Sequence, residues 1–196
     1  MPQQSHPLGA GKSSFDLIDP ERLFAALHLQ PGEAVLDLGC GEGRYTLPLA
    51  SRVGPGGSVY AVDLWEEGLA LLRARADQEG LANLRIIRAD ASRPLPLPGG
   101  CIDLALLATV LHDLAEAGQA KGALAEVARL VKPGGRLAIV EFKKVAGPPG
   151  PPLAIRLAPD EVNALLRPYG FEPGEVTDLG PHTYLAMFRQ DASFQS

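Results

Sequence analysis

Short apolar runs alternate with longer amphipathic segments over the first three quarters of the chain. Ala34–Leu38 is an apolar run with one acid, the pattern typical of a parallel strand that is buried on both faces. The segments between such runs space their apolar residues as helices do, and Asp19 before Pro20 and Gly80 are typical capping residues. The pattern predicts strands at 34–38, 58–63, 84–90, 102–110 and 136–142 and helices at 20–28, 44–52, 65–79 and 117–132.

The rhythm changes after the fifth predicted strand. A helix is predicted at 160–169, and two strand-like segments follow at 175–179 and 183–188. The turn between these strands, Gly180-Pro181-His182, is too short for a helical crossover, so the strands must run antiparallel. Strands that alternate with helices form a parallel sheet. The sequence therefore predicts an α/β fold with a doubly wound, Rossmann-like seven-stranded sheet, mostly parallel with an antiparallel C-terminal strand, and helices on both faces.

The same pattern fits a single domain at 19–190, with an N-terminal arm or lid at 1–18 and a flexible tail at 191–196. A chain of 196 residues is long enough to bury a full core. The longest apolar run, 104–111, falls well short of the about 20 residues that a membrane helix needs. The first residues contain no apolar secretory segment, so we expect a cytoplasmic protein without a membrane span.

Composition narrows the class of partner. A formal net charge of −5 argues against a protein that coats nucleic acid, because the phosphates would be repelled. The two cysteines, Cys40 and Cys101, have neither metal-ligand spacing nor a disulfide framework, which suits a reducing compartment. We therefore expect a small-molecule partner, no nucleic acid and no metal. The sequence does not decide between a monomer and a homodimer.

A glycine-rich turn and three strand-end acids carry the first functional signal. Gly39, Gly41 and Gly43 follow the first predicted strand, where ligands of doubly wound sheets bind and where backbone must approach the ligand closely. Asp63 ends the second strand about twenty residues later and could accept hydrogen bonds from ribose hydroxyls. Asp90 ends the third strand and could reach an adenine amino group. A single acid of this kind is often only a solvated cap, but the set predicts a nucleoside-type ligand.

The identity of the nucleoside stays open at this level. The dinucleotide fingerprint is G-x-G-x-x-G, whereas this loop places its third glycine one position too early, at Gly43. A nicotinamide-dependent oxidoreductase is therefore a disfavoured alternative, and the terminal hairpin disfavours it further.

The ordered motifs resemble those of one family. Val35–Gly43 looks like motif I of class I S-adenosylmethionine-dependent methyltransferases, and Val62-Asp63, Ala89-Asp90-Ala91 and Leu130–Gly135 resemble the family's later landmarks. The resemblance covers about residues 15 to 190, and the combination is more specific than any one motif. Within the family the chain is most similar to small proteins related to ubiquinone/menaquinone C-methyltransferases, the methyltransferase type 11/25 neighbourhood, whose members have diverse substrates.

The resemblance implies S-adenosyl-L-methionine as cofactor and S-adenosyl-L-homocysteine as product. It also implies that Phe15, Asp16 and Leu17 close over the cofactor as a lid, although Phe15 could equally be a simple apolar anchor of the arm. The implied contacts are to the methionine portion from Asp37, Gly39, Cys40, Gly41 and Gly43, to the ribose from Asp63, to the adenine from Leu64, Asp90 and Ala91, and to the sulfonium from Ala108 or Thr109.

Three side chains are candidates for the chemistry on the acceptor, for which a general base is optional. His112 follows the fourth predicted strand and could accept a proton near neutral pH, or could simply cap the strand and line the pocket. Glu141 ends the fifth strand and could orient a cationic or hydroxylic acceptor, or only pair with a lysine. Tyr184, in the last hairpin, is a candidate for the acceptor wall.

The class of methyl acceptor is narrowed mainly by sequence motifs that the chain lacks. The stretch Ala108–Asp113 lacks the Asn/Asp-Pro-Pro-aromatic pattern with which amino-methylating DNA enzymes hold a flipped base, and no Pro-Cys pair offers a thiolate. The sequence therefore predicts a transferase that moves a methyl group by in-line displacement to a small molecule, at an oxygen, nitrogen or carbon atom that it does not identify. The alternative is a protein that binds S-adenosylmethionine without catalysis.

Overall fold

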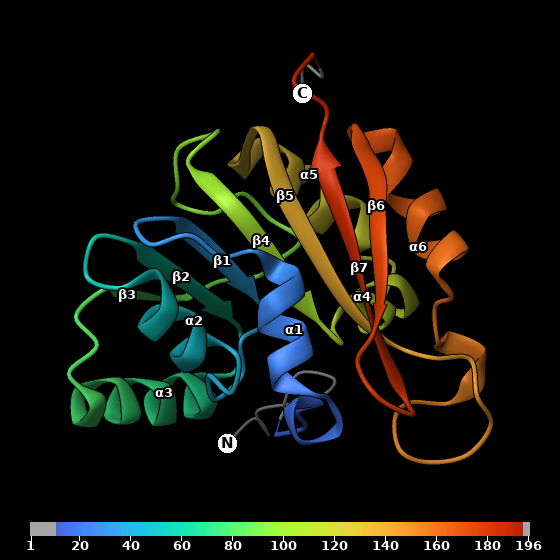
Figure 1. The fold of residues 1–196 in the computed structure, drawn as a ribbon, viewed down its shortest axis with the longest axis horizontal. Helices are drawn as coiled ribbons and strands as arrows, with labels where there is room; N and C mark the ends of the chain where they lie inside the picture. Colours follow the sequence, from blue (N-terminus) through green and yellow to red (C-terminus); the bar gives the residue numbers. More distant parts are fainter. Residues whose placement is uncertain (1–10, 194–196) are drawn as a thin grey trace, which may run out of the picture.

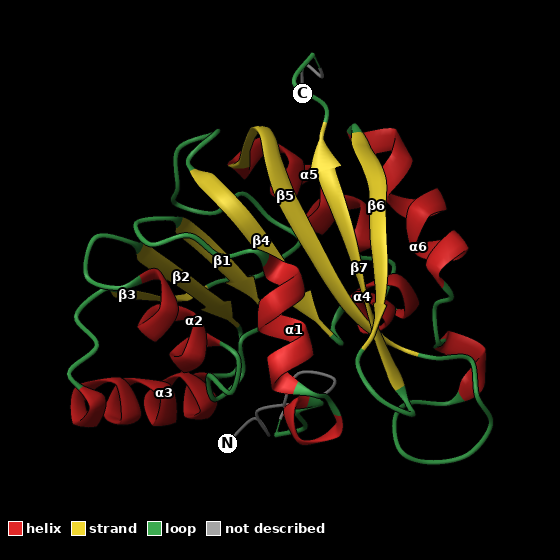
Figure 2. Ribbon diagram, viewed as in Figure 1, coloured by secondary structure: helices red, strands yellow, loops and turns green. Residues whose placement is uncertain are grey.

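The computed structural model describes residues 11–193, which form a seven-stranded sheet with helices on both faces (Figures 1 and 2). The expectations for the first part of the arm and for the end of the tail concern residues 1–10 and 194–196, outside the described residues. The strands are β1 (Ala34–Leu38), β2 (Ser58–Asp63), β3 (Leu84–Arg88), β4 (Ile102–Ala108), β5 (Val131–Phe142), β6 (Phe171–Asp178) and β7 (Thr183–Gln190).

One helix precedes the first strand, and the others lie in the segments that connect the strands. They are α1 (Pro20–Leu27), α2 (Thr46–Val53), α3 (Glu66–Glu79), α4 (Leu111–Glu116), α5 (Ala120–Leu130) and α6 (Pro159–Leu166), with the 3-10 turns η1 (Phe15–Leu17), η2 (Leu153–Ile155) and η3 (Arg167–Tyr169). Within residues 11–193, no helix is both long and apolar enough to cross a membrane.

The sheet order confirms the expected fold class. The strands lie in the order β3-β2-β1-β4-β5-β7-β6, and β1 to β5 pair in parallel. Strand β7 runs antiparallel to β6, as the short turn between them required, and also antiparallel to β5. Two apolar layers enclose the sheet: α1 and α2 bury Leu23, Leu27 and Leu49 on one face, and α4 to α6 bury Leu111, Leu124 and Val162 on the other.

Several predicted boundaries are confirmed, and the differences lie around β4 and β5, at the start of α5 (Ala120 rather than 117) and at the start of β6 (Phe171 rather than 175). Asp19 caps α1 through hydrogen bonds from the backbone N–H groups of Glu21 and Arg22, and Gly80 ends α3 in the left-handed region. The predicted fourth strand is too long, because Thr109 adopts a φ of 54° and the chain then enters α4, a helix that the pattern did not indicate. Strand β5 begins at Val131 because that residue already pairs with Ile102.

The carboxyl ends of the central strands meet at one edge of the sheet. In Figure 2 the arrowheads of β1, β2 and β4 point to the lower edge of the sheet, near the turn η1 that precedes α1. This is the edge at which open α/β sheets bind ligands.

Candidate functional site

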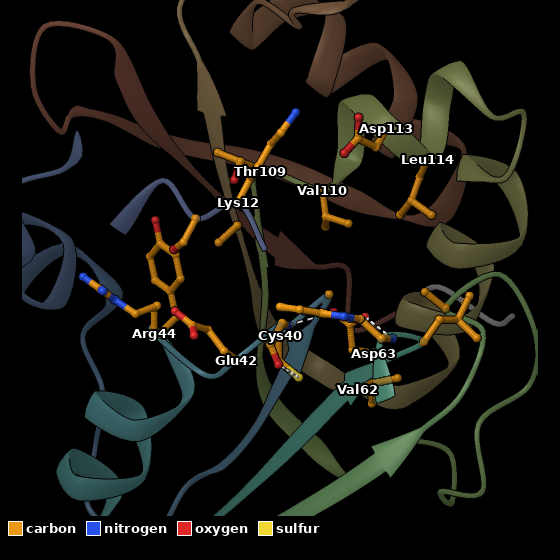
Figure 3. Close-up of a pocket in the computed structure, with 18 of the residues that line it drawn as sticks. Lys12, Cys40, Glu42, Arg44, Val62, Asp63, Thr109, Val110, Asp113 and Leu114 are labelled. Atoms are coloured by element: carbon orange, nitrogen blue, oxygen red, sulfur yellow. Dashed lines mark hydrogen bonds between the residues drawn. The ribbon is translucent and has the colours of Figure 1, made fainter. Parts of the chain in front are cut away.

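A cavity of about 360 Å³ opens at this edge of the sheet (Figure 3). Its volume lies in the usual range of small-molecule sites. The walls come from the loop after β1, the ends of β2 and β3, the turn from β4 into α4, α4 with the segment after it, and the N-terminal segment before η1. The glycine loop and the residues that end β2 and β3 therefore meet at one site, whereas the motif Leu130–Gly135 lies outside its wall.

The glycine loop after β1 forms the floor of the cavity. The backbone N–H of Gly39 donates to the carbonyl of Val62 on β2 (2.8 Å), and a Cβ on Gly39 would lie only 2.8 Å from Val110. Gly39, Cys40 and Gly41 line the cavity, whereas Gly43 does not. Gly43 serves packing, because a Cβ there would lie 2.2 Å from Leu72 on α3.

Asp63 is held at the cavity by backbone donors. One carboxylate oxygen accepts from the N–H of Gly41 (2.8 Å) and the other from the N–H of Trp65 (2.8 Å). These two bonds fix the carboxylate at the end of β2, where the sequence predicts a ribose contact. Trp65 also lines the cavity.

The predicted adenine contacts also line the cavity. Asp90 accepts hydrogen bonds from the backbone N–H and the hydroxyl of Ser92 (2.9 and 2.7 Å), and these bonds hold the pKa of its carboxyl below its ordinary value. Ala91 lies beside Asp90. Leu64, just after the end of the neighbouring strand β2, is 44% exposed. An exposed leucine at this place leaves apolar surface for a planar ring to cover.

Asp37 lies beneath the loop rather than in the cavity wall. Its side chain is 1% exposed and accepts a hydrogen bond from the hydroxyl of Thr46 (2.5 Å). Burial raises the pKa of Asp37 to about 7, with the bond from Thr46 acting against the shift and the charge of Asp63 adding to it. Asp37 does not line the cavity, so it would act on the methionine portion of a cofactor through the glycine loop above it and not by direct contact.

The end of β4 brings a strained residue to the cavity. Ala108 and Thr109 both line it, and Thr109 has a φ of 54°, which is an outlier for a β-branched residue. Strain of this kind persists only where the surroundings impose it. Here the backbone N–H of Thr109 still pairs with the carbonyl of Val140, and its hydroxyl lies 3.1 Å from that of Ser14.

The N-terminal segment closes one side of the cavity through Ser14. This serine is 2% exposed, and its hydroxyl lies 2.7 Å from the hydroxyl of Tyr45 as well as close to Thr109. The ring of Phe15 packs edge-on against Tyr45 with centroids 5.0 Å apart. Ser14 and Tyr45 line the cavity, whereas Phe15 lies behind them, so Ser14 is the contact that the sequence did not single out.

The three candidate side chains for acceptor chemistry all lie outside the cavity wall. His112 is 4% exposed and Glu141 is fully buried, and the Nδ1 of His112 lies 2.8 Å from a carboxylate oxygen of Glu141. Tyr184 is 3% exposed and donates its hydroxyl hydrogen to the carbonyl of Leu157 (2.7 Å). The sequence predicts His112 just after the fourth strand, but the structure places it in α4, while Glu141 lies near the end of β5 as expected; the pairing of the two was not predicted.

Asp113, the neighbour of His112, lines the cavity in its place. In Figure 3 it projects from α4, the helix that also supplies Leu114, on the side of the opening away from Glu42 and Cys40. Within residues 11–193, no group of three His, Cys, Asp or Glu side chains is placed to hold a metal ion.

Comparison with known proteins assigns the family. A family model described as a methyltransferase domain matches residues 35–135, which include the glycine loop, the strand-end acids and the turn into α4. The chain therefore belongs to this methyltransferase domain family, as the motif resemblance implied.

Two curated relatives and one solved structure place the chain within the family. The ubiquinone/menaquinone biosynthesis C-methyltransferase UbiE of Ectopseudomonas mendocina is 36% identical over 130 residues, 66% of this chain and 48% of the relative. Nocamycin O-methyltransferase of Saccharothrix syringae is 33% identical over 140 residues, 70% of this chain and 42% of the relative. The crystal structure of an S-adenosylmethionine-dependent methyltransferase from Aquifex aeolicus superposes with a TM-score of 0.81 at 31% identity and covers 93% of this chain and 94% of that chain.

The chain matches less than half the length of these two curated relatives. The relatives also differ in the atom they methylate, since one is named a C-methyltransferase and the other an O-methyltransferase. Similarity therefore supports the class of the domain and leaves its acceptor to be argued from the site.

Proposed function

We propose that this protein binds S-adenosylmethionine in the cavity at the carboxyl ends of β1, β2 and β4 and transfers its methyl group to a small-molecule acceptor. The observation that carries the proposal is the position of Asp63. Its carboxylate is fixed at the cavity by the N–H groups of Gly41 and Trp65, and it lies in the same wall as Asp90 and Ala91. Family membership supports the choice of cofactor over other nucleosides.

The described residues fit such a cofactor. Asp63 and Asp90 both line the cavity, and their carboxylate oxygens are acceptors suited to the hydroxyl and amino groups of a nucleoside. Backbone N–H groups already hold both carboxylates in place. The space above Gly41 is also open, because a Cβ built on that glycine meets no atom within 4 Å.

The bound cofactor supplies a methyl carbon that a positively charged sulfur activates for displacement. The protein's part is then alignment and exclusion of water. Gly39 and Gly41 hold backbone close to the ligand, and Asp63 orients the ribose. Ser14 ties the N-terminal segment to Tyr45 and Thr109 and so closes the cavity on the side of the predicted lid.

Calorimetric titration with S-adenosylhomocysteine and, in parallel, with NADH tests the proposal. We expect the first ligand to bind and the second to bind far more weakly, because the glycine loop lacks dinucleotide spacing. Tight binding of NADH together with no binding of S-adenosylhomocysteine would overturn the proposal.

A second candidate function is cofactor binding without catalysis, as in a sensor or scaffold. It is favoured by the burial of His112, Glu141 and Tyr184, since none of these side chains lines the cavity. The two functions differ in turnover: only an enzyme forms S-adenosylhomocysteine from S-adenosylmethionine when a suitable acceptor is present.

A further inference from the structure

Four carboxylates line the cavity, and three of them already have close protein partners. Glu42 pairs with Arg75 (3.2 Å), Asp63 accepts two backbone N–H groups, and Asp90 accepts from Ser92. The fourth, Asp113, has a side chain that is 24% exposed, and its one side-chain partner among the described residues is the Nε2 of His112 at 3.5 Å. Asp113 is therefore the carboxylate with the most remaining capacity to bind a ligand in this cavity.

A buried pair stands behind Asp113. Glu141 accepts hydrogen bonds from the backbone N–H of His112 (3.0 Å) and from that of Phe142 (3.2 Å), and it also contacts Nδ1 of the His112 ring at 2.8 Å. These contacts leave the ring of His112 little freedom to turn. Its other nitrogen, Nε2, then faces Asp113.

The charges of Glu141 and Asp113 favour the positively charged form of the His112 ring. Burial of the ring works against the cation, but the hydrogen bond to Glu141 and the negative charges of Glu141 and Asp113 outweigh it and raise the pKa of His112. Arg156, the other charged group that acts on the ring, works in the opposite direction. In its charged form the ring of His112 donates to Glu141 through Nδ1 and attracts the Asp113 carboxylate, 3.5 Å from Nε2, which makes it an anchor for Asp113 rather than a base.

We infer that Asp113 binds the methyl acceptor through an O–H or N–H group that the acceptor presents and takes the proton of that group, while Glu141 and His112 position the Asp113 carboxylate. The inference rests on the proposed function, because it needs a methyl donor in the same cavity. It assigns the acceptor to a class, small molecules with an ionisable hydroxyl or amine, and assigns His112 and Glu141 a positioning role.

The bond changes balance within this arrangement. The O–H or N–H bond of the acceptor breaks, its proton goes to the carboxylate of Asp113, and its electron pair stays on the acceptor atom. The acceptor atom forms its new bond to the methyl carbon as the carbon–sulfur bond breaks, and the electrons of that bond stay on sulfur. The proton then leaves Asp113 for solvent, which reaches this partly exposed side chain.

The acceptor class is tested on the protein saturated with S-adenosylhomocysteine. Three probes are titrated: catechol, which presents O–H groups, benzylamine, which presents N–H groups, and benzoate, an anion without such a donor. We expect catechol or benzylamine to bind and Asp113→Asn to weaken that binding at least about tenfold, since it removes a charge-assisted hydrogen bond. Benzoate should bind no more weakly to Asp113→Asn than to the unchanged protein.

Glu116→Gln is the matched control, because Glu116 is an exposed acid on the same helix and does not line the cavity. This variant should bind all three probes as the unchanged protein does. If the unchanged protein binds neither donor probe, or if Asp113→Asn binds them equally well, the inference is overturned although cofactor binding stands. A protein that binds no S-adenosylhomocysteine would instead overturn the proposed function.

The positioning role has its own readout in the nitrogen-15 shifts of the His112 ring, assigned with His112→Gln. We expect its titration midpoint to fall in Asp113→Asn and to fall further in Glu141→Gln, because Glu141 makes the shorter contact. Asp113→Glu, which keeps the charge, should retain most of the shift. An unchanged midpoint in Asp113→Asn would show that the two side chains are independent and would overturn this role.

Discussion

The two sides of the cavity hold their carboxylates in opposite ways. On the side of β2 and β3, Asp63 and Asp90 stand in the cavity wall and are fixed by backbone N–H groups a few residues away or in the neighbouring loop. On the side of β4 and β5, Glu141 is fully buried and holds His112, and only Asp113 reaches the cavity.

This difference separates two kinds of task. Backbone donors come with the fold and do not ionise, so the first side offers a fixed frame suited to hydroxyl and ring-nitrogen groups of a nucleoside. The second side couples two carboxylates through an ionisable ring, and such a unit responds to a proton that a ligand brings. We expect changes on the first side to alter cofactor affinity and changes on the second to alter stability and acceptor binding.

The largest effect is expected for Glu141→Ala. It leaves the buried His112 ring without its partner, and breaking a buried ion pair typically costs about 3–5 kcal/mol of unfolding free energy. Chemical denaturation followed by tryptophan fluorescence measures this loss. Glu172→Ala, at an exposed position of β6, should change stability by less than about 0.5 kcal/mol. Similar values for the two variants would contradict the contrast between the two sides.

Asp63→Ala should come next and act on affinity. Removing the carboxylate takes a partner from the ribose hydroxyls and frees the N–H groups of Gly41 and Trp65, so S-adenosylhomocysteine should bind more weakly by about 1–3 kcal/mol. Calorimetry measures the change. Asp77→Ala, on the exposed face of α3, is the matched control and should bind normally. Unchanged affinity in Asp63→Ala would show that Asp63 does not contact the cofactor.

Cofactor affinity should also rise with pH through Asp37. Its pKa is raised to about 7 in the folded protein, so the group ionises near neutral pH and its burial costs stability as the pH rises from about 4 to about 7. A cationic ligand favours the ionised form, so binding of S-adenosylmethionine should strengthen by about tenfold from about pH 6 to about pH 8. Titrations in Asp37→Asn should lose this dependence, and a dependence that survives would assign it to another group.

The smallest effect is expected at the N-terminal segment. Ser14→Ala removes the hydroxyl that joins Tyr45 and Thr109, so cofactor affinity should fall by about 1 kcal/mol, roughly fivefold. Ser51→Ala, at an exposed position of α2, is the control. Equal affinities for S-adenosylhomocysteine in the two variants would show that the contacts of Ser14 do not close the cavity over the ligand.

The fold and the gathering of Asp63 and Asp90 at one cavity could be predicted from the sequence because their determinants are local. Asp19 before Pro20 starts α1, Gly80 ends α3, and the run Ala34–Leu38 forms the buried β1. The alternation of strands and helices implies parallel strands, and parallel strands have their carboxyl ends at one edge of the sheet. Asp63 and Asp90, which follow such ends, are therefore expected at the same edge. Gly39 and its neighbours followed from the same rule.

The acceptor side depended on contacts between residues far apart in the sequence. The sequence showed an acid in β1 but not that Thr46 and the loop would bury Asp37. It showed His112 and Glu141 at neighbouring strand ends but not their 2.8 Å contact. Pairings of this kind depend on the packing of α4 against β5, which no local pattern encodes.

The sequence by itself determined the succession of strands and helices along the chain, the glycine loop and the edge of the sheet where the acids gather. Only the tertiary structure decided which of two adjacent residues, His112 or Asp113, lines the cavity. Thr109 turns the backbone out of β4, α4 begins at Leu111, and consecutive helical residues point about 100° apart. His112 therefore turns inward to Glu141, and Asp113 turns to the cavity.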